Sequence, residues 1–310
     1  MTGTVYKSTG SWYAVKAADG LFYKARLKGK LRIGGITSTN PIAVGDVIDM
    51  KLEDETERSC IISRIHDRKN YITRQSPHNK HQHHIIASNI DQSYLFATLR
   101  DPKTSLGFID RFLITSEAYH IQSVIIYNKV DLYDEQDMKR LEELTEIYER
   151  IGYKVASVSV QQNIGIAAIK ESLRNKVTLL SGHSGVGKST FINKLFPELD
   201  LKTQEVSEWS GKGLHTTTFA EMFDLEIGGK IIDTPGLREF ALMDIPKEEL
   251  AHYFPEMRAL IHYCKFNNCI HTSEPGCAIK NALNEGHISE ERYVSYLTIL
   301  DSIGEKKNND

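Results

Sequence analysis

The sequence predicts a multidomain protein in which a central α/β domain lies between a small all-β domain and a helical domain. Residues 1–67 contain short β-rich runs, the chain from residue 93 alternates strand-like and helix-like stretches, and residues 241–310 are acidic and helical. A chain of 310 residues suits two or three domains, because single cores rarely grow beyond ~200 residues. We expect the boundaries at 1–68, 69–240 and 241–310.

The first domain contains five β-rich runs: GTVYKS, SWYAVKA, LFYKARL, VGDVIDM and SCIISRI. Five short strands without a helical period predict a small barrel, for which the OB-fold is the usual solution, and such barrels often bind oligonucleotides. Aromatic and basic side chains alternate here as RNA stacking and phosphate contact require: Tyr13, Phe22, Tyr23, Lys24, Arg26, Lys28, Lys30 and Arg32. The alternative is a barrel that only supports the next domain, with its aromatic side chains in the core.

The central domain is predicted from strands that alternate with helices. SYLFATL, QSVIIYN, YKVASVS and KVTLLSG have the composition of buried strands, and GFIDRFLITSEAY has apolar residues at helical spacing. A longer helix follows QSVIIYN and carries one apolar stripe from Met138 to Ile151. Such alternation predicts βαβ units around a mostly parallel sheet, with ligands at the carboxyl ends of its strands.

The segment KVTLLSGHSGVGKST predicts a phosphate-binding loop, because it joins a strand, a glycine loop and a helix start and fits G-x-x-x-x-G-K-S. Backbone N–H groups would surround the phosphates, Lys188 would reach the β- and γ-phosphates, and the Ser189 hydroxyl would ligate Mg²⁺. The motif alone allows ATP or GTP. The residues expected to contact nucleotide are Gly182, His183, Ser184, Gly185, Val186, Gly187, Lys188, Ser189 and Thr190.

Asn128-Lys129-Val130-Asp131 indicates guanine, since this NKxD sequence follows a buried strand. Asp131 can accept hydrogen bonds from the guanine N1–H and 2-amino group, which adenine cannot supply together. Asn128 can meet the base edge, and the stem of Lys129 can lie over the ring; the alternative is a charged turn. Ser159 and Val160 follow the next strand and are the expected backbone contact to the guanine O6, although GTPases usually have Ala at the second position.

Asp233-Thr234-Pro235-Gly236 follows the strand-like KIIDT and is expected to complete the phosphate end of the site. Asp233 would hold Mg²⁺ through water, and the Gly236 N–H would meet the γ-phosphate. The Gly- and Thr-rich segment 211–218 suits a mobile loop, in which Thr217 or Thr218 would coordinate Mg²⁺ when GTP is bound. The predicted ligands are therefore GTP or GDP with Mg²⁺.

Two departures from the ordinary GTPase pattern matter. The guanine sequence precedes the phosphate loop, which predicts a circularly permuted P-loop GTPase domain. Leu237 stands where Ras-type enzymes have the glutamine that positions water, so intrinsic turnover should be slow and dependent on a partner. We expect Lys188 and Thr217 to serve catalysis with His215 as the candidate that positions water; the alternative for His215 is a solvent-exposed loop histidine.

Cys264, Cys269, His271 and Cys277 lie within fourteen residues, in a stretch rich in turn formers. Three thiolates and an imidazole suit a closed, tetrahedral, structural Zn²⁺ site. The alternative is a loop of reduced thiols. A second group, His78, His81, His83 and His84, is expected in a solvated loop between the first two domains.

The formal net charge of −3 argues against a uniformly basic nucleic-acid binder, but the charge is unevenly distributed. Residues 1–70 have 12 Lys and Arg against 8 Asp and Glu, whereas residues 241–310 have 7 against 11. The basic N-terminal segment could therefore meet an anion. Neither a membrane span nor a signal peptide is visible, so we expect a cytoplasmic protein without a membrane partner.

These motifs together resemble the RsgA (YjeQ/YloQ) family of ribosome-associated GTPases. The resemblance covers residues 1 to about 300 and includes Asn89-Ile90-Asp91-Gln92 at the start of the GTPase domain. It implies a monomer that hydrolyses GTP under stimulation by the small ribosomal subunit, late in maturation of that subunit, with the barrel and zinc domain on ribosomal RNA. The departures are Val160, the histidine-rich loop and Leu214, where an Arg or Lys is common.

Two other functions were considered. A GTP-sensing, RNA-binding scaffold with negligible catalysis would share the nucleotide site and the barrel. A P-loop ATPase or small-molecule kinase would share only the phosphate loop and would prefer ATP.

Overall fold

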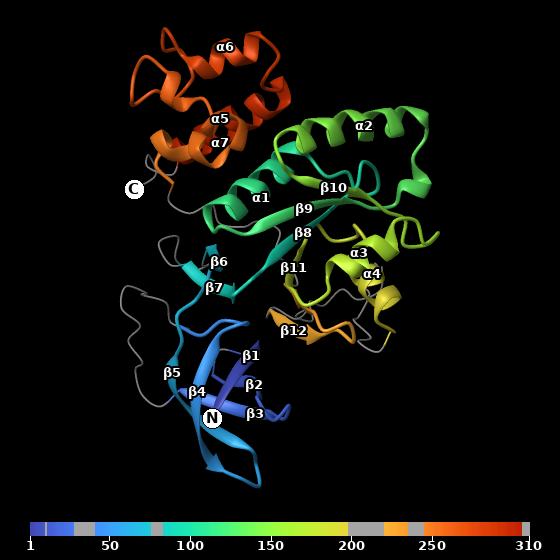
Figure 1. The fold of residues 1–310 in the computed structure, drawn as a ribbon, viewed down its shortest axis with the longest axis vertical. Helices are drawn as coiled ribbons and strands as arrows, with labels where there is room; N and C mark the ends of the chain where they lie inside the picture. The colour runs from blue at the N-terminus through green and yellow to red at the C-terminus, as the bar shows by residue number, and fades with distance from the viewer. Residues whose placement is uncertain (10, 28–40, 76–82, 198–219, 235–244, 306–310) are drawn as a thin grey trace, which may run out of the picture.

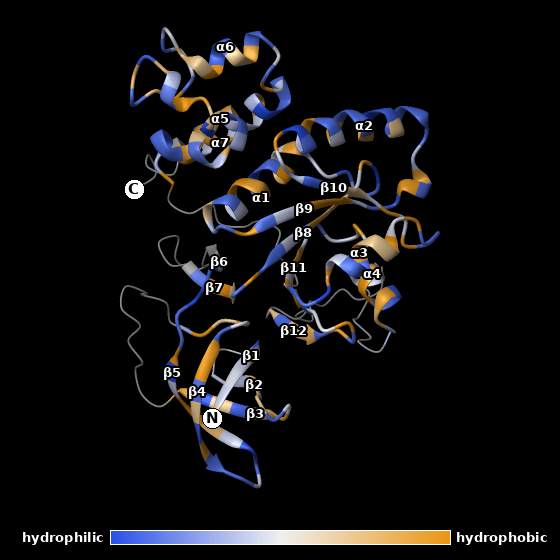
Figure 2. Cartoon of the chain, viewed as in Figure 1, coloured by the Kyte–Doolittle hydropathy of each residue, from blue (hydrophilic) through white to orange (hydrophobic). Residues whose placement is uncertain are grey.

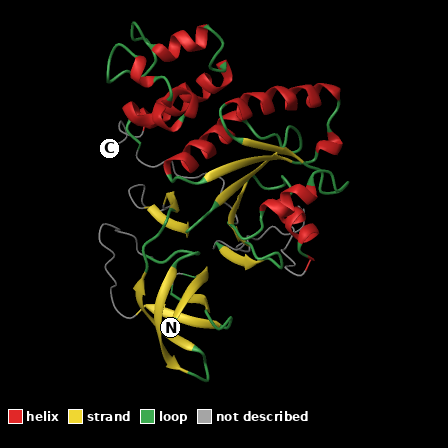
Figure 3. Ribbon diagram, in the orientation of Figure 1, coloured by secondary structure: helices red, strands yellow, loops and turns green. Residues whose placement is uncertain are grey.

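The computed structural model describes residues 1–305 apart from 10, 28–40, 76–82, 198–219 and 235–244. A β-barrel lies at one end of the long axis, the α/β domain lies in the middle, and the C-terminal helices lie at the other end (Figure 1). Secondary structure changes along the same axis, from strands through a mixed layer to helices (Figure 3). The multidomain fold class predicted from the sequence is confirmed.

The N-terminal barrel consists of the five expected strands: β1 (Thr2–Ser8), β2 (Tyr13–Ala17), β3 (Phe22–Leu27), β4 (Val47–Asp54) and β5 (Ser59–Ile65). They pair in the order β1-β2-β3-β5-β4, and a further β1–β4 pairing closes the barrel. Only the β3–β5 pair is parallel. Alternate side chains such as Val5, Val15 and Ile48 point inward and are fully buried, which gives this domain its own core.

The central sheet has the order β10-β9-β8-β11-β13-β12. Its strands are β8 (Gln92–Ala97), β9 (Gln122–Tyr127), β10 (Lys154–Ser157), β11 (Val177–Ser181), β12 (Glu221–Asp224) and β13 (Lys230–Asp233). All neighbours are parallel except β12 and β13. The strand before the phosphate loop, β11, therefore lies at the centre of the sheet although three strands precede it in the chain, as the predicted permutation requires.

Helices cover both faces of this sheet. α1 (Leu106–Ala118) and α2 (Glu135–Arg150) share one core with Leu95 and Ile125, whereas α3 (Ile166–Ser172) and α4 (Lys188–Leu195) share another with Phe96 and Ile126. The outer face of α2 is hydrophilic (Figure 2). Asp134 begins α2 with a capping box, in which it accepts from the Asp137 N–H while the Asp137 carboxylate accepts from the Asp134 N–H.

The C-terminal domain combines short helices, η3 (Lys247–Tyr253), α5 (Pro255–Arg258), η4 (Ile261–Tyr263) and α6 (Ala278–Asn284), with the long helix α7 (Glu290–Glu305). Their core includes Ile114 of α1, so this domain packs directly on the central α/β domain. Arg292 of α7 is buried at that contact and donates to Asp110 of α1 at 2.6 Å and to Glu256 of α5 at 2.7 Å. Tyr148 also donates to Asp110, at 2.9 Å.

The barrel is joined to the central sheet through strand β1. Lys7 lies opposite Glu221 of β12, so the two sheets continue into one another. A bulge places Tyr6 outside the β1–β2 register, and its side chain packs in the core of the central domain and donates to Asp224 at 2.6 Å. Burial alone would raise the pKa of Asp224, but hydrogen bonds from Lys16 and Tyr6 outweigh burial and hold this pKa below its usual value.

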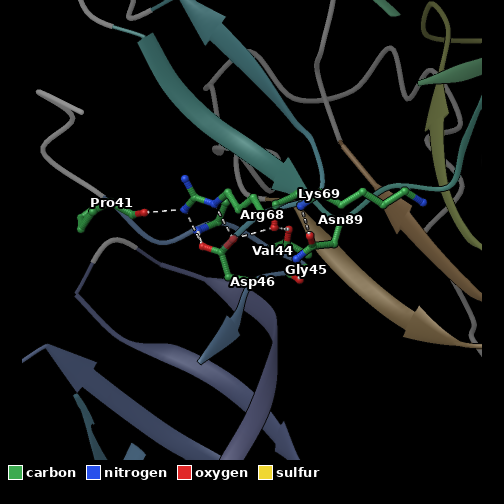
Figure 4. Close-up of polar contacts among 9 residues, drawn as sticks. Pro41, Val44, Gly45, Asp46, Arg68, Lys69 and Asn89 are labelled. Atoms are coloured by element: carbon green, nitrogen blue, oxygen red, sulfur yellow. Dashed lines mark hydrogen bonds and ion pairs between the residues drawn. The ribbon is translucent and has the colours of Figure 1, made fainter. Parts of the chain in front are cut away.

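A buried ion pair fixes the segment that leads from the barrel into the central α/β domain (Figure 4). The guanidinium of Arg68 donates to both carboxylate oxygens of Asp46 at 2.6 Å and to the Pro41 carbonyl at 2.7 Å. The Asn89 side chain donates to the Gly45 carbonyl at 2.9 Å. The Arg68 contacts attach the linker to the barrel, and the Asn89 contact attaches the segment before β8 to the barrel as well.

A two-stranded hairpin that the sequence did not predict follows this junction, formed by β6 (Tyr71–Gln75) and β7 (His83–Ser88). The expectation of a solvated loop is therefore wrong for His83 and His84, which belong to β7. The apolar run Ile85-Ile86-Ala87 after His84, of which Ile85 and Ala87 are buried, explains the strand. His78 and His81 lie outside the described residues.

Candidate nucleotide site

The predicted nucleotide-binding segments meet at one edge of the central sheet because they follow parallel strands in matched register. Leu180 of β11 is paired with Asp233 of β13, and Ala97 of β8 is paired with Tyr127 of β9. Tyr127 is in turn paired with Ser157 of β10. The phosphate loop, the NKVD sequence, the Ser159 segment and Asp233 consequently lie at the carboxyl ends of neighbouring strands, where ligands bind in open α/β sheets.

The phosphate loop requires glycine at two positions for space as well as conformation. Gly182 has φ 136°, and a Cβ there would lie 2.4 Å from the Phe96 carbonyl oxygen. Gly187 has φ 95°, and a Cβ there would lie 2.3 Å from Nδ2 of Asn128. Ser184 and Gly185 are exposed, so the loop is open to a ligand, and α4 begins directly after it at Lys188.

Lys188 lies inside this loop, where its ammonium donates to the carbonyls of Gly182 at 2.6 Å and His183 at 2.8 Å. Burial lowers the pKa of Lys188, and the nearby Asp233 carboxylate opposes that change. Burial raises the pKa of Asp233, with Lys188 opposing it. A cation and an acid thus face each other at the end of β11 and β13, where a phosphate and its metal ion would be held. Thr190, by contrast, is exposed on α4.

The NKVD sequence is held against the phosphate loop by Asn128, whose side-chain amide donates to the Val186 carbonyl at 2.8 Å. Its backbone N–H donates to the Ala97 carbonyl at 2.9 Å. Lys129 adopts a left-handed conformation with φ 64°, and Asp131 follows on the 3₁₀ turn η1 (Val130–Leu132). The structure therefore brings together the sequence-predicted phosphate and base segments.

The segment that contains Ser159 lies beside the NKVD sequence at the same edge of the sheet. The Ser159 N–H and carbonyl are paired with Ile164 at 3.1 and 3.0 Å, and the Val130 N–H donates to Val158 at 3.2 Å. The side chain of Val160 is buried in the core, so replacement of the usual Ala changes packing while the backbone remains at the site. His215, Thr217, Thr218 and Gly236, together with Leu214 and Leu237, lie outside the described residues.

Sequence reasoning missed the loop between β8 and α1. Pro102 of this loop is the nearest residue to Gly185, since a Cβ on that glycine would lie 3.5 Å from the proline Cδ. His183 of the phosphate loop stacks on Phe108 of α1, with ring centroids 3.8 Å apart. No residue pattern in the loop suggested these contacts, because they join segments about 80 residues apart in the chain.

The four residues of the predicted metal site converge in the C-terminal domain. The thiol sulfurs of Cys264, Cys269 and Cys277 and a ring nitrogen of His271 all lie within 4.8 Å of one another. His271 Nδ1 is 3.6 Å from the Cys264 sulfur and 3.4 Å from the Cys277 sulfur. Tetrahedral Zn²⁺ with ordinary bond lengths places sulfur and nitrogen about 3.6 Å apart, so the cluster has the dimensions of such a site.

Neighbouring residues hold this cluster in shape. The Glu274 carboxylate accepts from the N–H groups of Ile270 at 2.8 Å and Thr272 at 2.9 Å. Tyr293 donates to the carbonyl of His271 at 2.6 Å. Burial lowers the pKa of His271, which favours the neutral imidazole that metal ligation needs. The donor set and its surroundings therefore fit a structural metal.

The barrel has an open pocket of about 420 Å³ next to strands β2 and β3. Trp12, Phe22 and Tyr23 line it together with basic side chains, and the Lys24 ammonium lies 4.3 Å from the centre of a Trp12 ring. Tyr13, which was expected to suit RNA stacking, points inward from β2 and is only 2% exposed, so it belongs to the core. Arg26 is paired with Glu53, and Lys28, Lys30 and Arg32 lie outside the described residues.

Comparison with known proteins identifies the family. The RsgA GTPase family model matches residues 65–243, and the model of the RsgA N-terminal domain matches residues 2–61. The chain belongs to the RsgA GTPase family. A Flavobacterium psychrophilum relative named "Small ribosomal subunit biogenesis GTPase RsgA" is 52% identical over the whole chain and 95% of its own length. A Bacteroides fragilis relative of the same name is 49% identical over 99% of this chain and 98% of its own.

Solved structures of RsgA-family proteins agree with the fold described above. YjeQ from Thermotoga maritima is 33% identical, with a TM-score of 0.78 over 97% of this chain and 98% of its own. YloQ, described as a circularly permuted GTPase, is 27% identical, with a TM-score of 0.75 over 100% of this chain and 96% of its own. The resemblance drawn from the sequence motifs is confirmed. Among the helices that the structure describes, none is both long and apolar enough to span a membrane.

Proposed function

We propose that this chain is a GTPase that binds the small ribosomal subunit and hydrolyses GTP during late maturation of that subunit. The observation that carries the proposal is the meeting of the phosphate loop, the NKVD sequence and Asp233 at one edge of the sheet. A phosphate loop alone would also suit an ATPase. The side-chain bond from Asn128 to Val186 supports a base site beside the phosphate loop, and the Asp131 carboxylate of the same sequence favours guanine over adenine.

The reaction we propose is in-line attack of water on the γ-phosphate of GTP. Lys188 would transfer its hydrogen bonds from the Gly182 and His183 carbonyls to phosphate oxygens and stabilise the charge that develops there. Backbone N–H groups of residues 182–190 would surround the phosphates at the start of α4. Mg²⁺ would neutralise β- and γ-phosphate oxygens, with Ser189, Thr217 and Asp233 as the residues that hold it. His215 is the proposed water-positioning group.

Guanine recognition is assigned to the loops beside the phosphate site. Asp131 would accept from the N1–H and 2-amino groups, Asn128 would meet the base edge, and Lys129 would lie along the ring. Because the Ser159 N–H is used by Ile164, the contact to O6 is assigned to the backbone of Val160. GDP would occupy the same site after hydrolysis.

Ribosomal RNA is the partner we propose for the barrel pocket. Trp12 and Phe22 offer stacking surfaces, and Phe22 is 48% exposed. Lys24 and Arg58 supply positive charge at the same pocket, which is the combination that single-stranded RNA requires. The basic charge is local to the barrel, so the overall net charge of −3 does not prevent RNA contact. We further propose a cytoplasmic monomer with one structural Zn²⁺ at the Cys264 cluster.

GTP turnover measured with and without purified small ribosomal subunits tests this function. We expect slow hydrolysis alone and a large stimulation by the subunit, with GTP preferred to ATP. An Asp131→Asn variant should lose that preference while its phosphate loop remains intact. Absence of stimulation would instead favour the GTP-sensing scaffold, and an ATP preference in the wild type would favour a P-loop ATPase or kinase.

A further inference from the structure

We propose that Tyr133 is a positioning residue for guanine recognition, which it serves by joining the NKVD sequence to the loop between β8 and α1. This inference rests on the proposed guanine site. The Tyr133 hydroxyl donates to the Asn128 carbonyl at 3.0 Å and accepts from the Leu99 N–H at 2.8 Å. One side chain thus connects the strand ends of β8 and β9 at the point where the base would bind.

The NKVD segment that Tyr133 contacts needs such support because its backbone adopts an unfavourable conformation at Lys129. Lys129 has φ 64°, a left-handed conformation that non-glycine residues adopt rarely and at a cost of ~1 kcal/mol or more. Asn128 immediately precedes this residue, and Asp131 follows two residues later. Fixing the Asn128 carbonyl therefore fixes the start of the turn that presents the Asp131 carboxylate. Burial raises the pKa of Tyr133, so its hydroxyl keeps the proton that it donates.

The loop on the other side of Tyr133 is rigid enough to act as an anchor. Thr104 closes residues 98–104, since its hydroxyl accepts from the Thr98 N–H at 3.1 Å and its N–H donates to the Thr98 carbonyl at 2.8 Å. The Thr98 hydroxyl donates to the Pro102 carbonyl. Arg100 then ties the loop to the capping residues of α2 through ion pairs with Asp134 and Asp137.

A second contact reaches the guanine segment from the same loop. The Lys129 ammonium donates to the Asp101 carbonyl, which holds the stem that would lie along the base. The Tyr133 and Lys129 contacts therefore attach the NKVD sequence at two places to the loop between β8 and α1. The base-binding geometry should depend on the Tyr133 hydroxyl even though that hydroxyl touches no atom of the nucleotide.

The test is a Tyr133→Phe variant of the full chain, which keeps the ring and removes only the hydroxyl. The substitution removes both hydrogen bonds of the hydroxyl, and a coupling to nucleotide binding worth one bond of ordinary net strength corresponds to roughly a five-fold change in an equilibrium. We expect the Kd for a fluorescent GDP analogue and the KM for GTP each to rise about five-fold, with kcat changed by less than two-fold. Preference for GTP over ITP, which lacks the 2-amino group, should fall because Asp131 is less well placed.

Tyr153→Phe is the matched control, because that buried tyrosine also donates to a polar partner, Glu117 of α1 at 3.4 Å, but makes no contact with the NKVD sequence or the loop between β8 and α1 in the bonds described. It should leave both Kd and the GTP/ITP ratio unchanged. The proposal is overturned if Tyr133→Phe keeps wild-type Kd and GTP/ITP preference, or if it lowers kcat alone. A lower melting temperature with unchanged nucleotide affinity would show a merely structural role. Asp131→Asn separates the two hypotheses: if that variant binds GDP normally, the guanine site itself is wrongly assigned.

Discussion

Replacement of Arg292 by Ala should destabilise the contact between the GTPase and C-terminal domains far more than loss of a surface ion pair would. The Arg292 side chain is 2% exposed, and its partners Asp110 and Glu256 are 1% and 6% exposed. Burial by itself would lower the pKa of Arg292, but the two carboxylates outweigh burial and raise it. The guanidinium also lies 4.7 Å from the centre of the Phe254 ring, so its removal leaves both charge and packing unmatched.

The size of the effect follows from the two carboxylates that the substitution leaves behind. Breaking a buried ion pair from one side costs about 3–5 kcal/mol, because the remaining charge has no compensation. For a domain of this size such a loss lowers the melting temperature by on the order of 10 °C. Arg258→Ala is the control at the same interface: Arg258 pairs with Glu117 at 2.9 Å, but its side chain is 50% exposed, so the cost should stay below about 1 kcal/mol.

Thermal and urea unfolding followed by circular dichroism would measure both variants. A third protein that carries Asp110→Leu, Glu256→Leu, Arg292→Met and Tyr148→Phe should regain most of the lost stability, since apolar side chains of similar volume replace buried ion networks at little cost and the last change removes the hydroxyl that donates to Asp110. Equal melting temperatures for Arg292→Ala and Arg258→Ala would refute the reasoning, because they would mean that burial adds nothing to the cost of removing the cation.

Three further predictions concern other parts of the chain. Gly187→Ala should weaken GDP binding at least 100-fold in a fluorescence titration, because the new Cβ would lie 2.3 Å from the Asn128 amide and occupy a left-handed position; a variant with normal affinity would contradict the loop geometry. Asp224→Asn should flatten the loss of stability on acidification: the folded pKa lies below the unfolded value of ~3.9, so the contribution is full above the unfolded value and is lost as pH falls from there through the folded pKa. Because Asp224 and Lys16 are partly exposed, the free energies of unfolding of wild type and variant should differ by less than about 1 kcal/mol in urea titrations between pH 6 and 3. Stability profiles that run parallel over this pH range would contradict the prediction. Cys277→Ser should reduce bound zinc from one equivalent to a small fraction in elemental analysis, whereas Cys60→Ser should retain it, since Cys60 lies in the barrel core.

The sequence was sufficient to predict what depends on local pattern and spacing. Five β-rich runs specified the barrel strands, and a strand, glycine loop and helix start specified the phosphate loop around Lys188. The permutation followed from the order of two motifs, and the metal cluster followed from four ligand residues within fourteen positions. In each of these cases the residue type serves a single chemical or conformational need, so the sequence alone is enough to predict the feature.

The remainder depends on side chains that meet only after the chain has folded. Tyr133 and Leu99 are 34 residues apart, and Arg292 and Asp110 are 182 residues apart. A tyrosine in a charged turn or an arginine in a terminal helix has many possible partners, and periodicity does not choose among them. The sequence did not predict the hairpin β6–β7 for a related reason: its second strand begins at the polar pair His83-His84, and the apolar run that follows is only three residues long.

The pairing of β1 with β12 also determines which pieces of this protein can exist separately. A strand at the end of a sheet exposes unpaired N–H and carbonyl groups, which recruit other chains into aggregates. Here the barrel covers that edge of the GTPase sheet, and Tyr6 fills part of the GTPase core from outside it. Removing the first 68 residues would therefore expose the unpaired edge of β12 and leave a cavity in the core of the GTPase domain where Tyr6 packs. The barrel thus covers the edge strand of the central sheet, so another domain could replace it only by covering that edge as well.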